Sequence, residues 1–192
     1  FLRQFFRSIA DSFRLSAKEM KRTSSLVGVA MLCAVNVVMG QFSIELTPTL
    51  KIGFAFLPVG VCGMLYGPVL TGLAGIANDL IKFFLKPSGQ FMIGFTLIEG
   101  LQGVLYGLFL YRNKVSIPRV FFTRLCITVF LNLCLTPLFL YLYYGQGFIG
   151  LVAGRLVKNI IMLPITTAVQ FVLLRTISEI PAVKSIRLKN RA

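Results

Sequence analysis

Ionisable side chains occur inside segments of this chain that are apolar enough to cross a lipid bilayer. Charged groups at membrane depth are costly, and they usually face the interior of a helix bundle or a polar cavity. They are therefore candidates for a binding site. Six such residues are Asp79, Lys82, Glu99, Arg124, Arg155 and Lys158. Four of them, Asp79, Lys82, Arg155 and Lys158, fall on the same side of the membrane in the topology derived below, which favours a pocket.

Composition places the chain among polytopic membrane proteins. Its 192 residues are 56% hydrophobic and 14% charged, with a mean hydropathy of +0.82. A soluble domain of this size could not cover so much apolar surface. The net charge of +14 arises from basic residues crowded beside apolar runs, which is typical of cytoplasmic loops and not of nucleic-acid binding.

The residue types that are missing exclude several kinds of chemistry. The chain has no histidine, which excludes histidine-based zinc sites and Ser-His or Cys-His catalysis. The four cysteines lie inside apolar runs without metal-ligand spacing, so they are interpreted as small packing residues. No phosphate-binding GxxxxGK[ST] loop is present. We expect no catalytic residues, no metal and no cofactor.

Six apolar segments follow the basic N-terminal stretch. A transmembrane helix needs about 20 residues to cross roughly 30 Å of hydrocarbon. Gly67 and Pro68 are expected to form a tight turn between the second segment and the third. The sequence predicts an all-α integral membrane protein, a bundle of six transmembrane helices. The predicted spans are 23–42, 50–66, 68–85, 91–111, 118–144 and 149–177.

The distribution of Lys and Arg sets the orientation. Fourteen lie in or close to the N-terminal segment, the connection between the fourth and fifth spans, and the C-terminal segment, with Arg119 and Arg175 counted at the edges of the neighbouring spans, against Lys51 and Lys86 in or close to the other connections. The positive-inside rule therefore puts both termini in the cytoplasm. We expect a cytoplasmic basic amphipathic segment at 1–22, a six-helix substrate-binding domain at 23–178 and a cytoplasmic basic tail at 179–192. A cleaved signal peptide is not expected, because no uninterrupted apolar region precedes a cleavage site.

Several polar residues in the predicted spans repeat at helical spacing. On the third span Asp79, Lys82 and Lys86 share one face near the outer end. The sixth span presents Arg155, Lys158 and Asn159 in the same way. Glu99 belongs to a stripe on the fourth span with Gln102 at its flank, and Asn132 lies at mid-depth on the fifth.

The outer connection at 41–51 is a candidate lid, and a long unstructured linker is the alternative.

These charges have two interpretations. They can pair with one another, Asp79 with Lys82 or Glu99 with Arg155, and only fix helix packing. That account leaves one cation over, because the outer half carries three cations (Lys82, Arg155 and Lys158) against two acids. An uncompensated buried cation costs several kcal/mol. A bound anion would remove this cost, with Arg155 in bidentate contact with a carboxylate and Lys158 beside it.

The first span carries Ala30 and Ala34, two small residues four apart. Such pairs allow helices to approach closely, either inside the bundle or against a partner.

Four further stretches carry a family resemblance. They are 49–58 (TLKIGFAFLP), 63–68 (GMLYGP), 86–91 (KPSGQF) with 94–96 (GFT), and 153–164 (AGRLVKNIIMLP). With them the chain resembles a substrate-binding S component of an energy-coupling factor (ECF) vitamin transporter, and it is most similar to the folate type.

The resemblance implies six helices with cytoplasmic termini and an outward pocket lined by helices four to six. It implies that Ala30 and Ala34 dock on a transmembrane coupling subunit, which sits on two cytosolic ATPases in a bacterial cell membrane. It also implies a toppling mechanism, in which the loaded component rotates within the membrane and releases its vitamin inward when the partners use ATP.

Folate suits these residues, because its glutamate tail brings two carboxylates and its pterin ring brings hydrogen-bond donors and a flat face. The cations suit the carboxylates of the glutamate tail. Asp79 or Glu99 suits the hydrogen-bond donors of the pterin ring, and an aromatic side chain can stack on its flat face. The candidate ligand-binding residues are Arg155, Lys158, Asn159, Asp79, Lys82, Glu99, Gln102, Phe42, Lys86, Phe91, Phe95 and Asn132.

Three alternatives remain open at this point. The chain can serve another anionic vitamin or precursor within the same superfamily. It can be a membrane-embedded enzyme that acts on lipid phosphates, with Asp79 and Lys82 at its centre. It can also form a small oligomeric channel. The expected partners are the vitamin, the coupling subunit, the two ATPases and membrane lipid, without nucleic acid.

Overall fold

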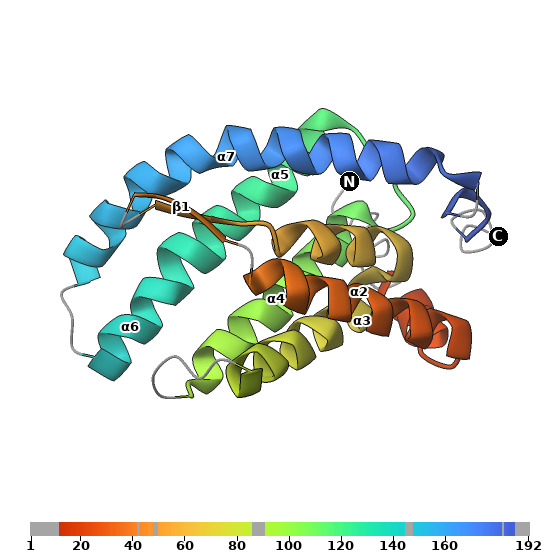
Figure 1. Cartoon of the computed structure of the whole chain (residues 1–192), viewed down its shortest axis with the longest axis horizontal. Coiled ribbons are helices and arrows are strands. Elements are labelled where there is room, and N and C mark those ends of the chain that lie inside the picture. The colour runs from red at the N-terminus through yellow and green to blue at the C-terminus, as the bar shows by residue number, and fades with distance from the viewer. Residues whose placement is uncertain are drawn as a thin grey trace.

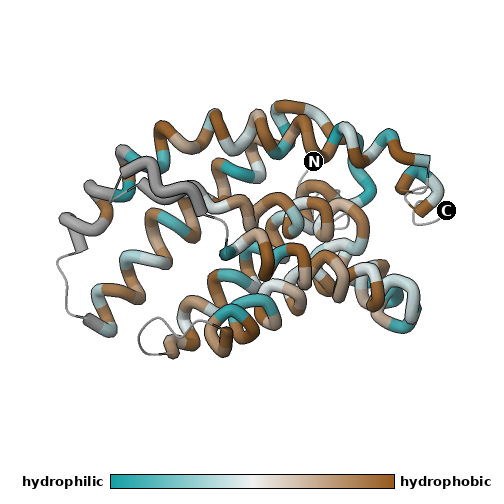
Figure 2. Tube along the Cα trace, in the orientation of Figure 1, coloured by the Kyte–Doolittle hydropathy of each residue, from teal (hydrophilic) through white to brown (hydrophobic). Residues whose placement is uncertain are grey.

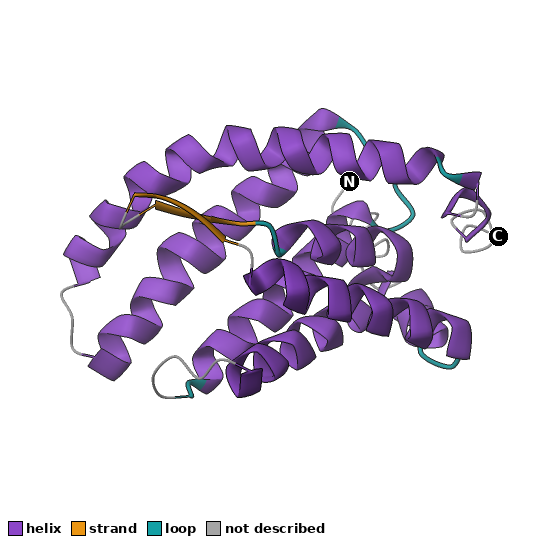
Figure 3. Ribbon diagram, viewed as in Figure 1, coloured by secondary structure: helices purple, strands orange, loops and turns teal. Residues whose placement is uncertain are grey.

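The computed structural model describes residues 12–41, 43–47, 50–85, 91–144, 148–181 and 183–186. This part of the chain is helical apart from one β-hairpin and short connections (Figure 1, Figure 3). Residues 12–19 are helical. The elements that follow are α2 (Thr23–Gln41), β1 (Ser43–Thr47), β2 (Leu50–Gly53), α3 (Phe56–Leu85), α4 (Ile93–Leu110), α5 (Ile117–Cys126), the π-helix η1 (Ile127–Leu135), α6 (Thr136–Tyr144) and α7 (Phe148–Glu179).

Five helical stretches among the described residues are long and apolar enough to cross a membrane. They are Thr23–Gln41, Phe56–Leu85, Ile93–Leu110, Ile117–Tyr143 and Lys158–Glu179. Figure 2 shows apolar residues along the length of these helices, interrupted by hydrophilic positions. The predicted architecture of apolar helices long enough to cross a membrane is confirmed, with five such stretches among the described residues where the sequence predicted six.

The second predicted span begins later than the sequence pattern indicated. Residues 50–53 form strand β2 instead of helix, and it pairs antiparallel with β1 in the register Ile44 with Ile52 and Glu45 with Lys51. The helix starts only at Phe56, so Pro58 lies in its first turn, where no intrahelical N–H donor is needed. The connection predicted as a lid or an unstructured linker therefore contains a hairpin.

A break at Gly67 divides α3 into two helical segments. Gly67 has φ 81° and ψ −175°, a conformation that glycine adopts far more readily than other residues. The predicted turn at Gly67 and Pro68 is confirmed. Ser16, from the N-terminal helical segment, satisfies the exposed backbone groups. Its hydroxyl donates to the Tyr66 carbonyl oxygen at 2.8 Å and accepts from the Val69 amide nitrogen at 3.1 Å. Ser16 thus caps the second half of α3.

Backbone contact through glycines joins α3 to α4. A Cβ atom added at Gly103 would lie 2.2 Å from the carbonyl oxygen of Thr71, and one added at Gly75 would lie 2.4 Å from the carbonyl oxygen of Glu99. At Gly107 an added Cβ would lie 2.3 Å from Pro68 Cα. These separations leave no room for a side chain, so the two helices pack backbone to backbone, as small residues permit in membrane helices.

The remaining helices assemble around this pair. α2 packs on α3, while α7 packs on the continuous helical stretch of α5, η1 and α6. Contacts of α4 with α5 and η1, and of α3 with α7, join the two groups. In Figure 1, α7 runs along one long side of the molecule and α2, α3 and α4 gather on the other. The shared core includes Met64, Tyr106, Ile127 and Leu174, each nearly inaccessible to solvent.

Replacing Gly103 by Ala tests the backbone contact. The new methyl group forces α3 and α4 apart, so we expect Gly103→Ala to lower the free energy of unfolding by about 1–3 kcal/mol. Thermal melting in detergent measures the change.

Gly40→Ala is the matched control, because the added Cβ meets only the flexible Lys82 side chain, at 3.1 Å from Cε. Alanine also favours helix over glycine, so this variant should melt at or above the wild-type temperature. Equal melting temperatures for Gly103→Ala and Gly40→Ala would contradict the backbone contact.

Candidate functional site

The structure brings together three of the predicted site residues where α3, α4 and α2 meet. Asp79 of α3 accepts a hydrogen bond of 2.6 Å from the Thr96 hydroxyl of α4. Glu99, one turn further along α4, interacts electrostatically with Lys82 and with Asp79. The Lys82 side chain extends over Gly40 of α2. We call these four residues, Asp79, Thr96, Glu99 and Lys82, the α3–α4 polar cluster.

Ion pairing does not account for this cluster. In the part of the chain that the structure describes, salt bridges form between Arg22 and Glu19 at 2.7 Å and between Arg175 and Glu179 at 3.7 Å. Neither Asp79 nor Glu99 forms one with Lys82 there. The pairing of Asp79 with Lys82 that the sequence allowed is therefore not observed among the described residues.

Helix α7 carries the second group of predicted residues. Arg155, Lys158 and Asn159 are all half-buried, and they fall within one turn of each other. Within the described residues, Arg155 has no ion pair. That these residues and the α3–α4 polar cluster take part in one pocket remains a prediction.

The other candidates have mixed positions. The Phe91 ring packs edge-on against Phe83 of α3, with 5.1 Å between ring centroids. Phe95 is partly buried against the core. Gln102 of α4 and Asn132 of η1 are half-buried. Asn132 therefore lies in a π-helical stretch, a feature that occurs frequently at functional sites. Phe42 and Lys86 lie outside the described residues.

Arg124, the last of the six ionisable residues named at the start, belongs to a network that crosses four helices. Its Nη1 donates to the Tyr106 hydroxyl of α4 at 2.7 Å, and this hydroxyl donates to Gln170 Oε1 of α7 at 3.2 Å. Its guanidinium carbon lies 4.3 Å from the centroid of the Phe56 ring, a cation–π contact. The network joins α5 to the start of α3, directly after the hairpin.

Sequence reasoning missed two members of this network, Phe56 and Gln170. Gln170 is completely buried, and a Cβ added at Gly60 of α3 would lie 2.0 Å from its Nε2. A glutamine inside an apolar run was the available signal, because buried amides require partners as buried charges do. Phe56 carried no comparable signal, since aromatic residues are frequent throughout the chain.

The two small residues of α2 are exposed. Ala30 and Ala34 lie on the outward face of the helix, beside Met31, which is 66% exposed. Of the two interpretations of this pair, packing inside the bundle is not observed, and the pair is available to a partner or to lipid.

Comparison with known proteins identifies the family. Residues 24–174 match the family described as ECF transporter, substrate-specific component. The chain is 36% identical over 146 residues to the folate transporter FolT of Clostridium novyi (strain NT), covering 76% of this chain and 85% of that protein. It is 31% identical over 169 residues to the folate transporter FolT of Streptococcus mutans, covering 84% and 90%.

A solved structure supports the same family assignment. A crystal structure of FolT bound with folic acid superposes with a TM-score of 0.73 at 35% sequence identity, covering 80% of this chain and 94% of that chain. The resemblance inferred from the four sequence stretches is confirmed. The chain belongs to the substrate-specific components of ECF transporters, and it is a multi-pass membrane subunit of a transporter, not an enzyme.

Proposed function

We propose that this chain is the folate-binding component of an ECF transporter. The observation that carries the proposal is the likeness to FolT bound with folic acid, at 35% identity over 80% of this chain. Relatives named as folate transporters in Clostridium novyi and Streptococcus mutans support it. The experiment is calorimetric titration of the purified protein with folate and a panel of other vitamins. Folate should bind with nanomolar affinity, and tighter binding of another anionic vitamin would replace folate in this proposal.

Charge complementarity gives this proposal its chemistry. Folate brings two carboxylates, and a half-buried Arg155 that has no ion pair in the described part of the chain is suited to receive one of them. Lys158 and Asn159, on the next turn of α7, supply further donors. The carboxylates Asp79 and Glu99 suit the donor groups of a pterin ring. Binding of the anion then offsets the cost of holding a cation at membrane depth.

The transport cycle that goes with this function involves partners. We infer six spans in the bacterial plasma membrane with both termini in the cytoplasm, the two halves of α3 counting as separate spans. The exposed Ala30 and Ala34 form the docking face for a transmembrane coupling subunit, which two cytosolic ATPases drive. The loaded chain topples in the membrane and releases folate inward.

Loss of the Arg155 guanidinium should weaken folate binding. Truncating one partner of a desolvated charge pair leaves the other charge unpaired, at a cost of about 2–5 kcal/mol. We therefore expect Arg155→Gln to raise the Kd by at least about 30-fold, which corresponds to about 2 kcal/mol. Titration calorimetry in detergent provides the measurement.

Arg175→Gln is the matched control for this change. Arg175 lies on the same helix, but its side chain is 66% exposed and it pairs with Glu179 at the surface. Its replacement should leave the Kd unchanged, because exposed pairs contribute little. If both variants bound folate as tightly as the wild type, Arg155 would have no place in the site.

A bulky residue on the docking face should separate binding from transport. Ala30→Trp places an indole where close helix contact is required, so folate uptake by whole cells should fall to background while the Kd of the purified protein stays unchanged. Val172→Trp is the control, because Val172 is 62% exposed on α7, away from α2. Normal uptake by Ala30→Trp, or equal loss in both variants, would refute the docking face.

A further inference from the structure

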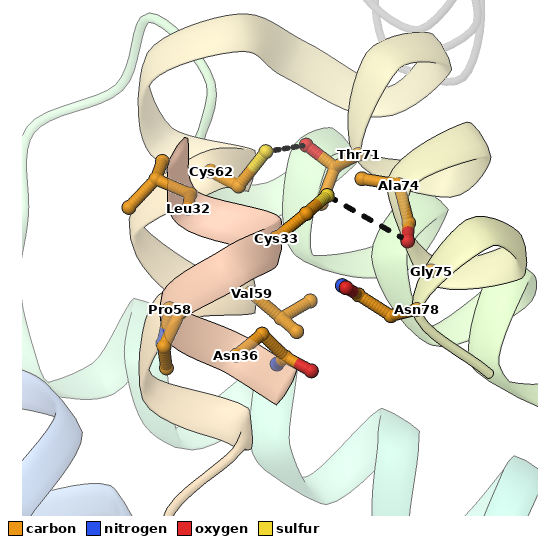
Figure 4. Close-up of a pocket in the computed structure, with 10 residues that line it drawn as sticks. All are labelled: Leu32, Cys33, Asn36, Pro58, Val59, Cys62, Thr71, Ala74, Gly75 and Asn78. Atoms are coloured by element: carbon orange, nitrogen blue, oxygen red, sulfur yellow. Dashed lines mark hydrogen bonds between the residues drawn. The ribbon is translucent and has the colours of Figure 1, made fainter. Parts of the chain in front are cut away.

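A small cavity lies between α2 and α3. Its volume is about 10 Å³, close to the minimum that holds one water molecule. Asn36 and Cys33 line it from α2, and Asn78, Thr71 and Cys62 line it from α3, among apolar neighbours (Figure 4). The cavity therefore has space for a single non-hydrogen atom, and its mostly apolar lining includes two amide side chains.

Both asparagines are buried with an oxygen atom that has no partner. Asn36 is 1% exposed and Asn78 is 4% exposed. The Asn36 Nδ2 donates to the Ala55 carbonyl oxygen. Among the residues that the structure describes, neither Asn36 Oδ1 nor Asn78 Oδ1 has a hydrogen-bond partner. A buried acceptor without a donor costs about 1–3 kcal/mol, so two of them in one cavity call for an occupant.

The chemistry of the lining restricts what this occupant is. It must supply two hydrogen bonds or a positive charge, because both unpartnered atoms are acceptors. The residues that line the cavity include no carboxylate. A cation in the cavity would therefore have no counter-charge among these residues. A neutral donor of one non-hydrogen atom fits the volume and can serve both acceptors.

We propose that this cavity binds one water molecule, which donates one hydrogen bond to Asn36 Oδ1 and the other to Asn78 Oδ1. The water joins α2 to α3 behind the face of α2 that exposes Ala30 and Ala34. The site is independent of the folate proposal, because it rests on the α2–α3 contact alone and involves none of the candidate ligand-binding residues.

A crystal structure of the protein at a resolution that shows ordered water tests the proposal directly. We expect one density peak within about 2.7–3.2 Å of both Oδ1 atoms. An empty cavity would overturn the proposal, and so would direct pairing of the two amides. A peak at the shorter separations of a metal ion would replace the water by a cation.

Stability measurements test the same site in solution. With water bound, Asn78→Leu removes one of its acceptors and should lower the melting temperature by about 2–4 °C. In a dry cavity the same change removes an unsatisfied acceptor, so the melting temperature would rise. That rise would overturn the proposal.

Two controls complete this test. Asn113 lies in the connection after α4, is half-buried, and donates to the Phe109 carbonyl oxygen at 3.2 Å. Asn113→Leu measures the effect of the same exchange away from the cavity, and Asn78→Leu should destabilise the protein more than this control does. Melting in sodium chloride and in choline chloride should agree for the wild type. Stabilisation by sodium that disappears in Asn78→Leu would show a cation site and refute the water.

Discussion

The α3 and α4 backbones touch at Gly75, Gly103 and Gly107, and the rest of the bundle is arranged around this contact. In a membrane, apolar side chains gain little from contacting one another instead of lipid, so helix association depends on close packing and on polar contacts. Contact without intervening side chains provides the closest packing available. It also fixes the height of α4 against α3, which is what brings Thr96 of α4 opposite Asp79 of α3.

Polar contacts then connect the helices that the glycines do not. Arg124, Tyr106 and Gln170 link α5, α4 and α7 in one chain of hydrogen bonds. The cation–π contact of Arg124 extends this chain to Phe56, where α3 begins. The charge of Arg124 thus contacts a hydroxyl and an aromatic ring, and the hydroxyl is in turn bonded to an amide. These contacts are electrostatic, and each gains strength from the low dielectric of the surroundings.

Local signals in the sequence predicted much of this fold, because their meaning does not depend on distant residues. Apolar length predicted the helices, and Gly67 with Pro68 predicted the break in α3. The hairpin was missed because Leu50 and Ile52 are apolar and continue the run that leads into α3, while strand pairing depends on residues elsewhere in the chain. The π-helical stretch of η1 was also not predictable, since a wider helical turn changes which side chains share a face.

The candidate site was less accessible to sequence reasoning. Helical spacing placed Asp79 and Lys82 on one helix correctly, but it gave no information about which neighbour each side chain meets. Lys82 extends toward Gly40 of α2, a direction that only the packing of α2 on α3 decides. The family itself was recognisable because its motifs are short and contiguous, so they survive without any knowledge of packing.

Ser16 has a consequence for the order in which the chain is made. The hydroxyl that completes the broken ends at Gly67 belongs to a segment that leaves the ribosome about fifty residues earlier. The cap is consequently already synthesised when α3 enters the membrane, and α3 never has to wait for a later helix to satisfy its exposed backbone groups. The most buried of the five described apolar helices is thus completed by a residue that is synthesised before any of those five.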